Sequence, residues 1–464
     1  MTLPRKLIAL ATAAVLAVAA GCGTEVKNPV TGRTERSVMD ERAELAEGRK
    51  AHDEVLKEYG VVKHPGLQAY VNGVGQKLAK QSHRPELPWT FTVLDSPEVN
   101  AFALPGGYVY VTRGIMAYLD SEADLAGVIG HEIGHVTARH GAQRATRQQN
   151  AGLGVLAASV LGMVLEAGGI GGAADLAGQV SQGVAAGYVA RYSREQELQA
   201  DQLGAEYLAR AQYDPRNMVD VIQVLRDQDQ FRADRARAEG REPASGNNWL
   251  ASHPSSEQQL AEIRQRAAAY KGQFGDDGRQ RFLRAIDGMP FGDNAEQGLV
   301  RGSEFYHPEL GFAISAPPGW RIVNDAEVLT LVNREGDAAL LLRLVPQNAG
   351  STHEEIIRNL VKPEQGQTER LTLRGGLSAT HFSGTRRDAQ GQRRNVELTI
   401  ASGPGNRHYL LQHAARDASA LQRARTGLRD ATLSFRTMTA ADRSAAQPWR
   451  VRTQPLPAGG FAEL

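Results

Sequence analysis

The chain has a single cysteine, Cys22, among 464 residues. An internal disulfide is therefore impossible, and a structural zinc site rich in cysteine has no thiols to use. An excess of one charge is also lacking, because 53 basic and 52 acidic residues leave a net charge of +1, and no stretch mixes clustered Lys and Arg with aromatic residues. Nucleic acid is therefore not an expected partner. With 41% hydrophobic and 23% charged residues, the composition is that of a globular protein of two or three domains.

Hydrophobic runs long enough to cross a bilayer are lacking as well, and the run at residues 7–20 is too short to span it comfortably. Because two basic residues precede this run, residues 1–21 are predicted to be a secretory signal peptide. Small residues then lead directly to Cys22 in a pattern that resembles a bacterial lipobox, which predicts a lipid anchor on Cys22. With Gly23 next, we expect a lipoprotein of the cell envelope that faces the periplasm on the outer membrane. The alternative is an incidental Cys22 and release of a soluble exported protein.

A second apolar stretch, residues 151–165, precedes a glycine-rich segment. One interpretation is a buried or partly exposed helical hairpin with a flexible tip. The other is a loop that touches the membrane or gates an active site. The sequence leaves both open.

Periodicity predicts two folded domains of the α+β class. The predicted divisions are a lipid-anchored tether at 22–40, a first domain at 41–270, a connector at 271–303, a smaller α+β domain at 304–437 and a flexible tail at 438–464. Within the first domain we expect helices at 41–59 and 65–82, a strand at 89–94, a hairpin of strands 100–104 and 108–112, and a helix after Ser121. The first domain is thus predicted to be mainly helical with a small β-sheet.

The clearest chemical signal is the motif His-Glu-Ile-Gly-His at residues 131–135. On a helix capped by Ser121, His131 and His135 share one face, from which both imidazoles reach a single zinc ion. Glu132 lies beside them and is the predicted general base. The motif also arises by chance, so it needs a third ligand to become specific.

Glu197 is the predicted third ligand, on a later helix. It shares a helical face with Asp201, which is predicted to orient a ligand from behind. The alternative is an exposed acidic face, since this spacing of acids is common. His140 is not expected to be a ligand, because the register of the longer three-histidine motif is not met and, on a continuing helix, His140 points away from His131.

These segments together carry a family resemblance. Over residues 40–270 the chain resembles metallopeptidase family 48, the HtpX-like and BepA-like zinc proteases. The resemblance rests on the segment HEIGHVTARH, with NAFALPGGYVYVTRG before it and SREQELQAD and LASHP after it. The resemblance implies a gluzincin-type fold with one zinc ion per chain, held by His131, His135 and Glu197, with Glu132 as base and Asp201 as the carboxylate behind a ligand. It also implies a hairpin strand as a ledge for extended substrate, which we expect to add beside residues 108–112.

The His-Pro of the family pattern falls at His253. In periplasmic relatives such a histidine approaches the zinc and restrains activity, so His253 is a candidate regulatory residue; it is alternatively a transition-state stabiliser or a plain loop histidine. Gln259 stands where relatives more often carry Arg. The C-terminal domain opens with FYHPELGFAISAPPGW, which resembles a module appended to lipoprotein members of the family. It contains no comparable catalytic cluster, and is expected to bind a protein partner in the envelope.

The expected function is that of a zinc-dependent metalloendopeptidase. Its substrates would be unfolded or misassembled envelope proteins, cleaved for protein quality control by water that zinc activates and Glu132 deprotonates. The expected partners are these substrates, the membrane through lipidated Cys22, and an envelope protein at the C-terminal domain. The alternative is a periplasmic chaperone or outer-membrane assembly factor with latent protease activity.

Overall fold

The computed structural model describes residues 23–149, 192–238, 249–253, 257–272, 274–324, 328–387 and 391–455. The predicted signal peptide, Cys22 and the apolar stretch 151–165 lie outside these residues. The chain divides into two compact units, Met1–Met289 with Val451–Leu464, and Pro290–Arg450. Among the described helices, none is both long and apolar enough to cross a membrane.

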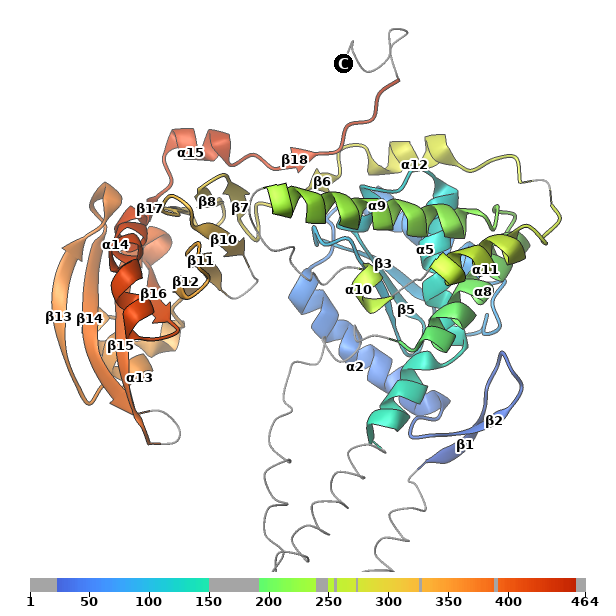
Figure 1. Ribbon diagram of the computed structural model, residues 1–464, viewed down its shortest axis with the longest axis horizontal. Coiled ribbons are helices and arrows are strands. Elements are labelled where there is room, and N and C mark those ends of the chain that lie inside the picture. Colours follow the sequence, from blue (N-terminus) through green and yellow to red (C-terminus); the bar gives the residue numbers. More distant parts are fainter. Residues whose placement is uncertain are drawn as a thin grey trace, which may run out of the picture. The chain divides into compact units, whose positions relative to one another are not determined.

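The first unit combines a small sheet with a larger set of helices (Figure 1). Its strands are β1 (Thr24–Lys27), β2 (Thr34–Ser37), β3 (Thr90–Leu94), β4 (Ala101–Leu104) and β5 (Tyr108–Thr112). Its helices are α2 (Glu41–Tyr59), α3 (Pro65–Ala79), α4 (Arg113–Met116), α5 (Glu122–Thr137), α8 (Arg194–Arg210), α9 (Asn217–Ala238), α10 (Trp249–Ser252), α11 (Glu257–Ala267) and α12 (Arg279–Ile286). The predicted fold class, a mainly helical domain with a small sheet, is confirmed.

The central sheet has the strand order β3-β5-β4. Strand β4 returns antiparallel to β5 through a tight turn in which Gly106 and Gly107 have φ values of 84° and 98°, a region that glycine enters without steric cost. Strand β3 lies parallel on the other side of β5. The prediction that substrate adds beside residues 108–112 is therefore wrong, because both edges of β5 are already paired. Strands β3 and β4 are the edge strands of this sheet.

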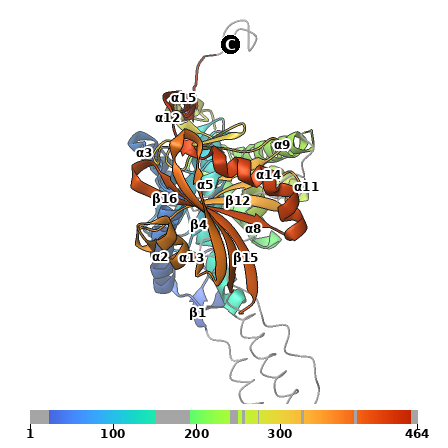
Figure 2. The same cartoon turned by 90° about the vertical axis from the view of Figure 1, so that its left-hand side faces the viewer.

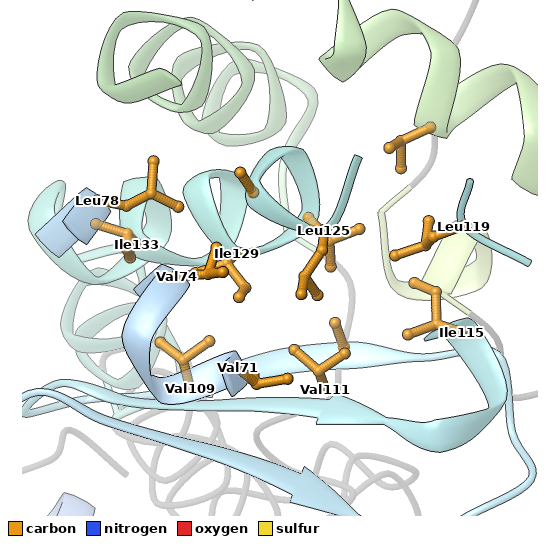
Figure 3. Packing of buried hydrophobic residues seen from close by; sticks show 14 of the residues in the cluster. Val71, Val74, Leu78, Val109, Val111, Ile115, Leu119, Leu125, Ile129 and Ile133 are labelled. Carbon is orange, nitrogen blue, oxygen red and sulfur yellow. The ribbon is translucent and has the colours of Figure 1, made fainter. Parts of the chain in front are cut away.

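Alternate residues of the sheet point into two apolar layers. One face packs on α3 and α5, where Figure 3 shows Ile129 and Ile133 of α5 above Val109 and Val111 of β5. The other face carries Phe102 and packs on α2. Helix α5 is thus buried on every side, and all of its residues are buried. A polar side chain on α5 consequently faces other protein groups rather than bulk water.

Glycines allow α5 and α8 to cross at close range. A Cβ atom added at Gly134 would lie 2.8 Å from the carbonyl oxygen of Ala200, and one at Gly204 would lie 3.0 Å from the backbone nitrogen of His131. Both distances are shorter than ordinary van der Waals contact. The two helices can therefore pack backbone to backbone only with glycine at these positions.

The N-terminal segment is more ordered than predicted. Strands β1 and β2 form an antiparallel hairpin within the predicted tether at 22–40. Asn28, in the turn, is buried and donates from its side chain to the carbonyl oxygen of Ala138, at a distance of 3.2 Å. The strands are short and largely polar, so no apolar alternation in the sequence indicates them.

The second unit is built on a seven-stranded antiparallel sheet of order β10-β11-β12-β16-β15-β14-β13. Figure 2 shows the second unit in a view turned by 90° from that of Figure 1. The strands of this sheet are β10 (Arg321–Asn324), β11 (Leu329–Val332), β12 (Ala338–Leu344), β13 (Gln365–Thr372), β14 (Ser378–Arg387), β15 (Arg393–Gly403) and β16 (Arg407–Ala415). The other strands are β6 (Pro290–Phe291), β7 (Leu299–Arg301), β8 (Glu304–His307), β9 (Phe312–Ser315), β17 (Arg436–Thr437) and β18 (Trp449–Arg450). The helices are α13 (His353–Val361), α14 (Ala418–Ser434) and α15 (Ala440–Ala445), with short 3₁₀ turns η1 (Gln347–Ala349), η2 (Arg374–Gly376) and η3 (Pro404–Asn406).

Helices α13 and α14 cover opposite faces of the large sheet. Ile356 of α13 packs with Phe382, whereas Leu428 of α14 packs with Ala379, three residues earlier on the same strand and therefore on its other face. The unit boundaries differ from those predicted. Helix α12, in the predicted connector, buries Phe282 in the core of the first unit. Helix α15 lies in the predicted tail.

Candidate metal centre

Helix α5 presents His131 and His135 one turn apart, and both side chains are buried. The helix begins at Ser121, whose side chain accepts a hydrogen bond from the backbone N–H of Asp124, as the sequence predicts. The two Nε2 atoms lie only 3.0 Å apart. The predicted pairing of these imidazoles on one face is therefore present, with both rings turned toward one point.

Helix α8 brings the two predicted carboxylates to that point. Its N-terminus is fixed by a capping box between Ser193 and Gln196. Glu197 lies 3.5 Å from His131 Nε2 through Oε2 and 3.6 Å from His135 Nε2 through Oε1. One turn later, Asp201 Oδ1 lies 2.8 Å from His131 Nδ1. Asp201 thus contacts the Nδ1 side of His131, whereas Glu197 lies beside the Nε2 atoms of both histidines.

Hydrogen bonds behind the rings fix the tautomers of both histidines. His131 Nδ1 donates to the Asp201 carboxylate, so in the neutral imidazole its Nε2 carries a lone pair. His140 Nε2 donates to Gln199 Oε1 at 2.9 Å, which leaves His140 Nδ1 as the acceptor of the 2.8 Å bond from His135 Nδ1. The lone pair of His135 is therefore also on Nε2. Two lone pairs 3.0 Å apart repel each other unless a proton or a metal ion lies between them.

His140 reaches this position because α5 ends earlier than expected. The prediction that His140 points away rests on a continuing helix, and that helix stops at Thr137. Arg139 then adopts a left-handed conformation with φ 62°, and its guanidinium donates to the carbonyl oxygen of Met39. The chain turns before the helical segment 140–149 begins. His140 is thus a hydrogen-bond partner of His135, outside the group of candidate metal ligands.

His253 completes a group of four candidate ligands with His131, His135 and Glu197. It directly follows α10 and is buried. Its Nδ1 atom lies 3.2 Å from His131 Nε2 and 3.2 Å from each oxygen of Glu197. Around a tetrahedral zinc with bonds of about 2.0–2.1 Å, ligand atoms stand roughly 3.3 Å apart. Three histidines and one carboxylate at these separations form a donor set that suits zinc.

The electrostatics of the group favour a bound cation. Burial raises the pKa of Glu197 to about 8. Burial also opposes a charge on His131, but its hydrogen bond to Asp201 and the charges of Asp201 and Glu197 outweigh this and raise the pKa to about 9. Burial lowers the pKa of His253 to about 4. Both raised pKa values mean that Glu197 and His131 hold a proton strongly, and a bound metal ion would take the place of these protons.

Glu132 lies beside the group and is held by a residue that the sequence interpretation missed. Trp249 donates from Nε1 to Glu132 Oε1 at 3.1 Å, and both side chains are buried. The second oxygen, Oε2, is buried without a hydrogen-bond partner among the described residues. His253 Nε2 lies 3.5 Å from Oε1. A tryptophan four residues before His253 was a signal in the sequence, but nothing there indicated that it would reach Glu132.

Of the two edge strands, β4 lies beside the site. A narrow cavity is lined by Ala103 and Leu104 of this strand together with His135 and Tyr192, whose ring stacks on His135 at 3.9 Å between centroids. At the other end of the strand, the backbone N–H of Trp249 donates to the carbonyl oxygen of Val99. An extended peptide that pairs with β4 would thus pass directly beside the candidate metal ligands.

Comparison with known proteins agrees with this geometry. Residues 65–267, which include α5, α8 and α10, match Peptidase family M48. This part of the chain belongs to Peptidase family M48. The M48 domain therefore contains every candidate ligand, and the predicted family resemblance is confirmed.

The relatives carry protease names. The beta-barrel assembly-enhancing protease of Escherichia coli (strain K12) is 32% identical over 45% of this chain and 40% of the relative. The putative beta-barrel assembly-enhancing protease of Vibrio cholerae is 30% identical over 57% of this chain and 52% of its own. The mitochondrial metalloendopeptidase OMA1 of Schizosaccharomyces pombe is 29% identical over 51% of this chain and 64% of its own. The chain thus spans between 40% and 64% of the length of these relatives.

Proposed function

We propose that the M48 domain is a zinc metalloendopeptidase in which His131, His135 and Glu197 hold the metal and Glu132 is the general base. The observation that carries this proposal is the pair of Nε2 lone pairs 3.0 Å apart, each fixed by a hydrogen bond on the far side of its ring. A metal ion, or a proton, between the two atoms makes that arrangement favourable. The membership in a metallopeptidase family supports the same assignment.

Several groups of the chain have separate roles in the proposed hydrolysis. When bound, zinc supplies Lewis-acid chemistry, which polarises a peptide carbonyl and makes water more acidic. Glu132 Oε2, buried without a partner among the described groups, is the oxygen available to take the proton from water and pass it to the leaving amine. Trp249 holds the other oxygen of Glu132. Strand β4 orients an extended substrate through main-chain hydrogen bonds, which tolerate many sequences.

His253 is proposed to restrain this reaction. Its Nδ1 lies among the other ligand atoms, where a substrate carbonyl or water would otherwise bind. Replacement by alanine, His253→Ala, is expected to increase cleavage. A decrease would assign His253 to stabilisation of the transition state instead, and an unchanged rate would remove it from both roles.

The test of the main proposal compares wild type with Glu132→Gln. The variant should retain zinc, measured by metal analysis of the purified protein, because Glu132 is not among the four candidate ligands. It should lose cleavage of an unfolded substrate such as denatured casein by a factor of about 10² to 10⁴, the usual contribution of a general base. Undiminished cleavage would refute the assignment of Glu132.

The proposed substrates are unfolded or misassembled envelope proteins. The support is the name of the relatives, beta-barrel assembly-enhancing protease, together with an edge strand, β4, to which an extended chain could pair. A second candidate is a chaperone or assembly factor with latent protease activity, which the position of His253 favours. Full rescue of an envelope-assembly defect by Glu132→Gln would select this second candidate.

The proposed location is the periplasmic side of the cell envelope, on the outer membrane through a lipid on Cys22. The lipobox-like sequence supports this proposal. We further propose that the second unit binds an envelope protein. Membrane fractionation of wild type and Cys22→Ser tests the anchor: the variant should move to the soluble fraction, and an unchanged membrane association would refute the lipid anchor at Cys22.

A further inference from the structure

Strands β14 and β15 of the second unit extend beyond their neighbours in the sheet. Strand β13 pairs with β14 only as far as Thr385, and β16 pairs with β15 only from Glu397 onward. The pairing of β14 with β15 continues past both points, to Arg387 opposite Arg393. Figure 1 shows these two strands reaching past β13 and β16. The end of the hairpin is therefore a two-stranded ribbon, and no other strand of the described residues pairs with it on either side.

This ribbon carries four exposed arginines in facing pairs. Arg386 lies opposite Arg394, and Arg387 lies opposite Arg393. Like charges directly opposite each other destabilise a pair of strands. Because the ribbon has no neighbouring strand, these arginines do not serve the packing of the sheet. Their arrangement costs stability that a bound anion would restore.

Acidic partners offset only part of the charge. Glu364 lies 2.6 Å from Arg387 and 3.2 Å from Arg393, so one carboxylate serves two guanidinium groups. Arg394 donates to the side-chain oxygen of Gln392, among other contacts. With Glu364 and the single acid of residues 386–394 counted, the segment keeps a net charge of +2. Arginine forms bidentate hydrogen bonds with phosphate groups, which makes phosphate a suitable counter-charge.

We infer that the four arginines of this ribbon, Arg386, Arg387, Arg393 and Arg394, bind a membrane surface rich in anionic phospholipids. The ribbon is a projecting end only two strands wide, so it suits a plane of headgroup phosphates better than a small ligand, which needs a concave site. It has no aromatic residue on which a nucleic-acid base could stack. Each guanidinium near an anionic surface strengthens binding about fivefold. The inference is independent of the proposed protease activity.

The test measures co-sedimentation of the full chain with lipid vesicles. Cys22→Ser is present in every sample, so that an acyl chain on this residue cannot cause binding. Vesicles of phosphatidylcholine alone are compared with vesicles of equal parts phosphatidylcholine and phosphatidylglycerol. We expect binding to the anionic vesicles to exceed binding to the neutral ones, and the difference to shrink as salt is added.

Three variants locate the binding surface. Arg386→Gln with Arg394→Gln should weaken binding to anionic vesicles roughly 25-fold. Arg321→Gln with Arg343→Gln, two exposed arginines on other strands of the same sheet, makes the same change in net charge and should alter binding less than about twofold. Glu364→Gln should strengthen binding about fivefold, because it removes the carboxylate that pairs with two of the arginines. Circular dichroism confirms that each variant is folded.

Three results would overturn the inference. Equal binding to neutral and anionic vesicles would show that phosphate charge is not recognised. Equal losses in the two double variants would show an effect of net charge alone. Binding of transfer RNA by the ribbon, with no binding to anionic vesicles, would assign it to a different polyanion.

Discussion

Trp249→Phe tests whether the hydrogen bond to Glu132 orients the general base. The substitution keeps an aromatic ring but removes the indole N–H that donates to Glu132 Oε1 at 3.1 Å. Glu132 is completely buried, and its nearest other polar neighbour on this oxygen is His253 Nε2 at 3.5 Å. A hydrogen bond to a charged group contributes about 1.5–3 kcal/mol. If the bond persists in the transition state, its loss should lower kcat roughly 10- to 100-fold.

The assay measures kcat on an unfolded protein substrate together with bound zinc. Zinc content should stay at the wild-type level, since Trp249 is not among the candidate ligands. Trp89→Phe is the matched control: Trp89 is also buried in the first unit, and its indole N–H donates to the carbonyl oxygen of Arg84 at 2.9 Å. The control should lose stability but keep kcat. A Trp249→Phe enzyme with kcat within twofold of wild type, or above it, would refute the orienting role.

Three further predictions concern the packing, the metal and the pH dependence. Gly134→Ala should lower the free energy of unfolding by about 1–3 kcal/mol and weaken zinc binding, because its Cβ would lie 2.8 Å from the carbonyl oxygen of Ala200 and push α8 away. Unchanged zinc affinity in a competition with a chelator would contradict this. Asp201→Asn removes the charge that orients His131 and should weaken zinc binding 10- to 100-fold in the same competition, whereas an effect below twofold would contradict it. Burial lowers the pKa of His307 to about 4 from 6.5, so between these values the unfolded chain binds a proton that the folded unit does not. The stability of the folded unit should therefore fall as the pH drops from about 6.5 to 4. In His307→Gln the thermal unfolding midpoint should depend less on pH over this window. An equal pH slope in both proteins would exclude His307 as the cause.

Local patterns in the sequence predicted the elements that depend on local physics. The helix at 41–59 has the predicted bounds, and the helix that begins after Ser121 has the predicted cap. The turn at Pro105-Gly106-Gly107 joins the predicted strands. In each case the signal comes from residues within a few positions of one another, through apolar spacing, a capping side chain or glycine in a turn.

Elements that depend on distant neighbours were missed. The hairpin at Thr24–Lys27 and Thr34–Ser37 is short and polar, and Asn28 is fixed by a residue more than a hundred positions away. The edge of the sheet was assigned to the wrong strand, because β3 reaches β5 from an earlier part of the chain by parallel pairing. Such pairings leave no periodic signal in either strand.

The candidate site divides in the same way. The sequence by itself determined the residue pattern from which the chemistry is proposed: two histidines one helical turn apart, a glutamate between them, and an acidic pair at helical spacing on a second helix. Only the tertiary structure decided which atoms face the metal position, because the tautomers of His131 and His135 are set by Asp201 and His140 from behind. It also brought the indole N–H of Trp249 to Glu132, the proposed base. These contacts join segments that are far apart in the chain, so they exist only once the helices have packed.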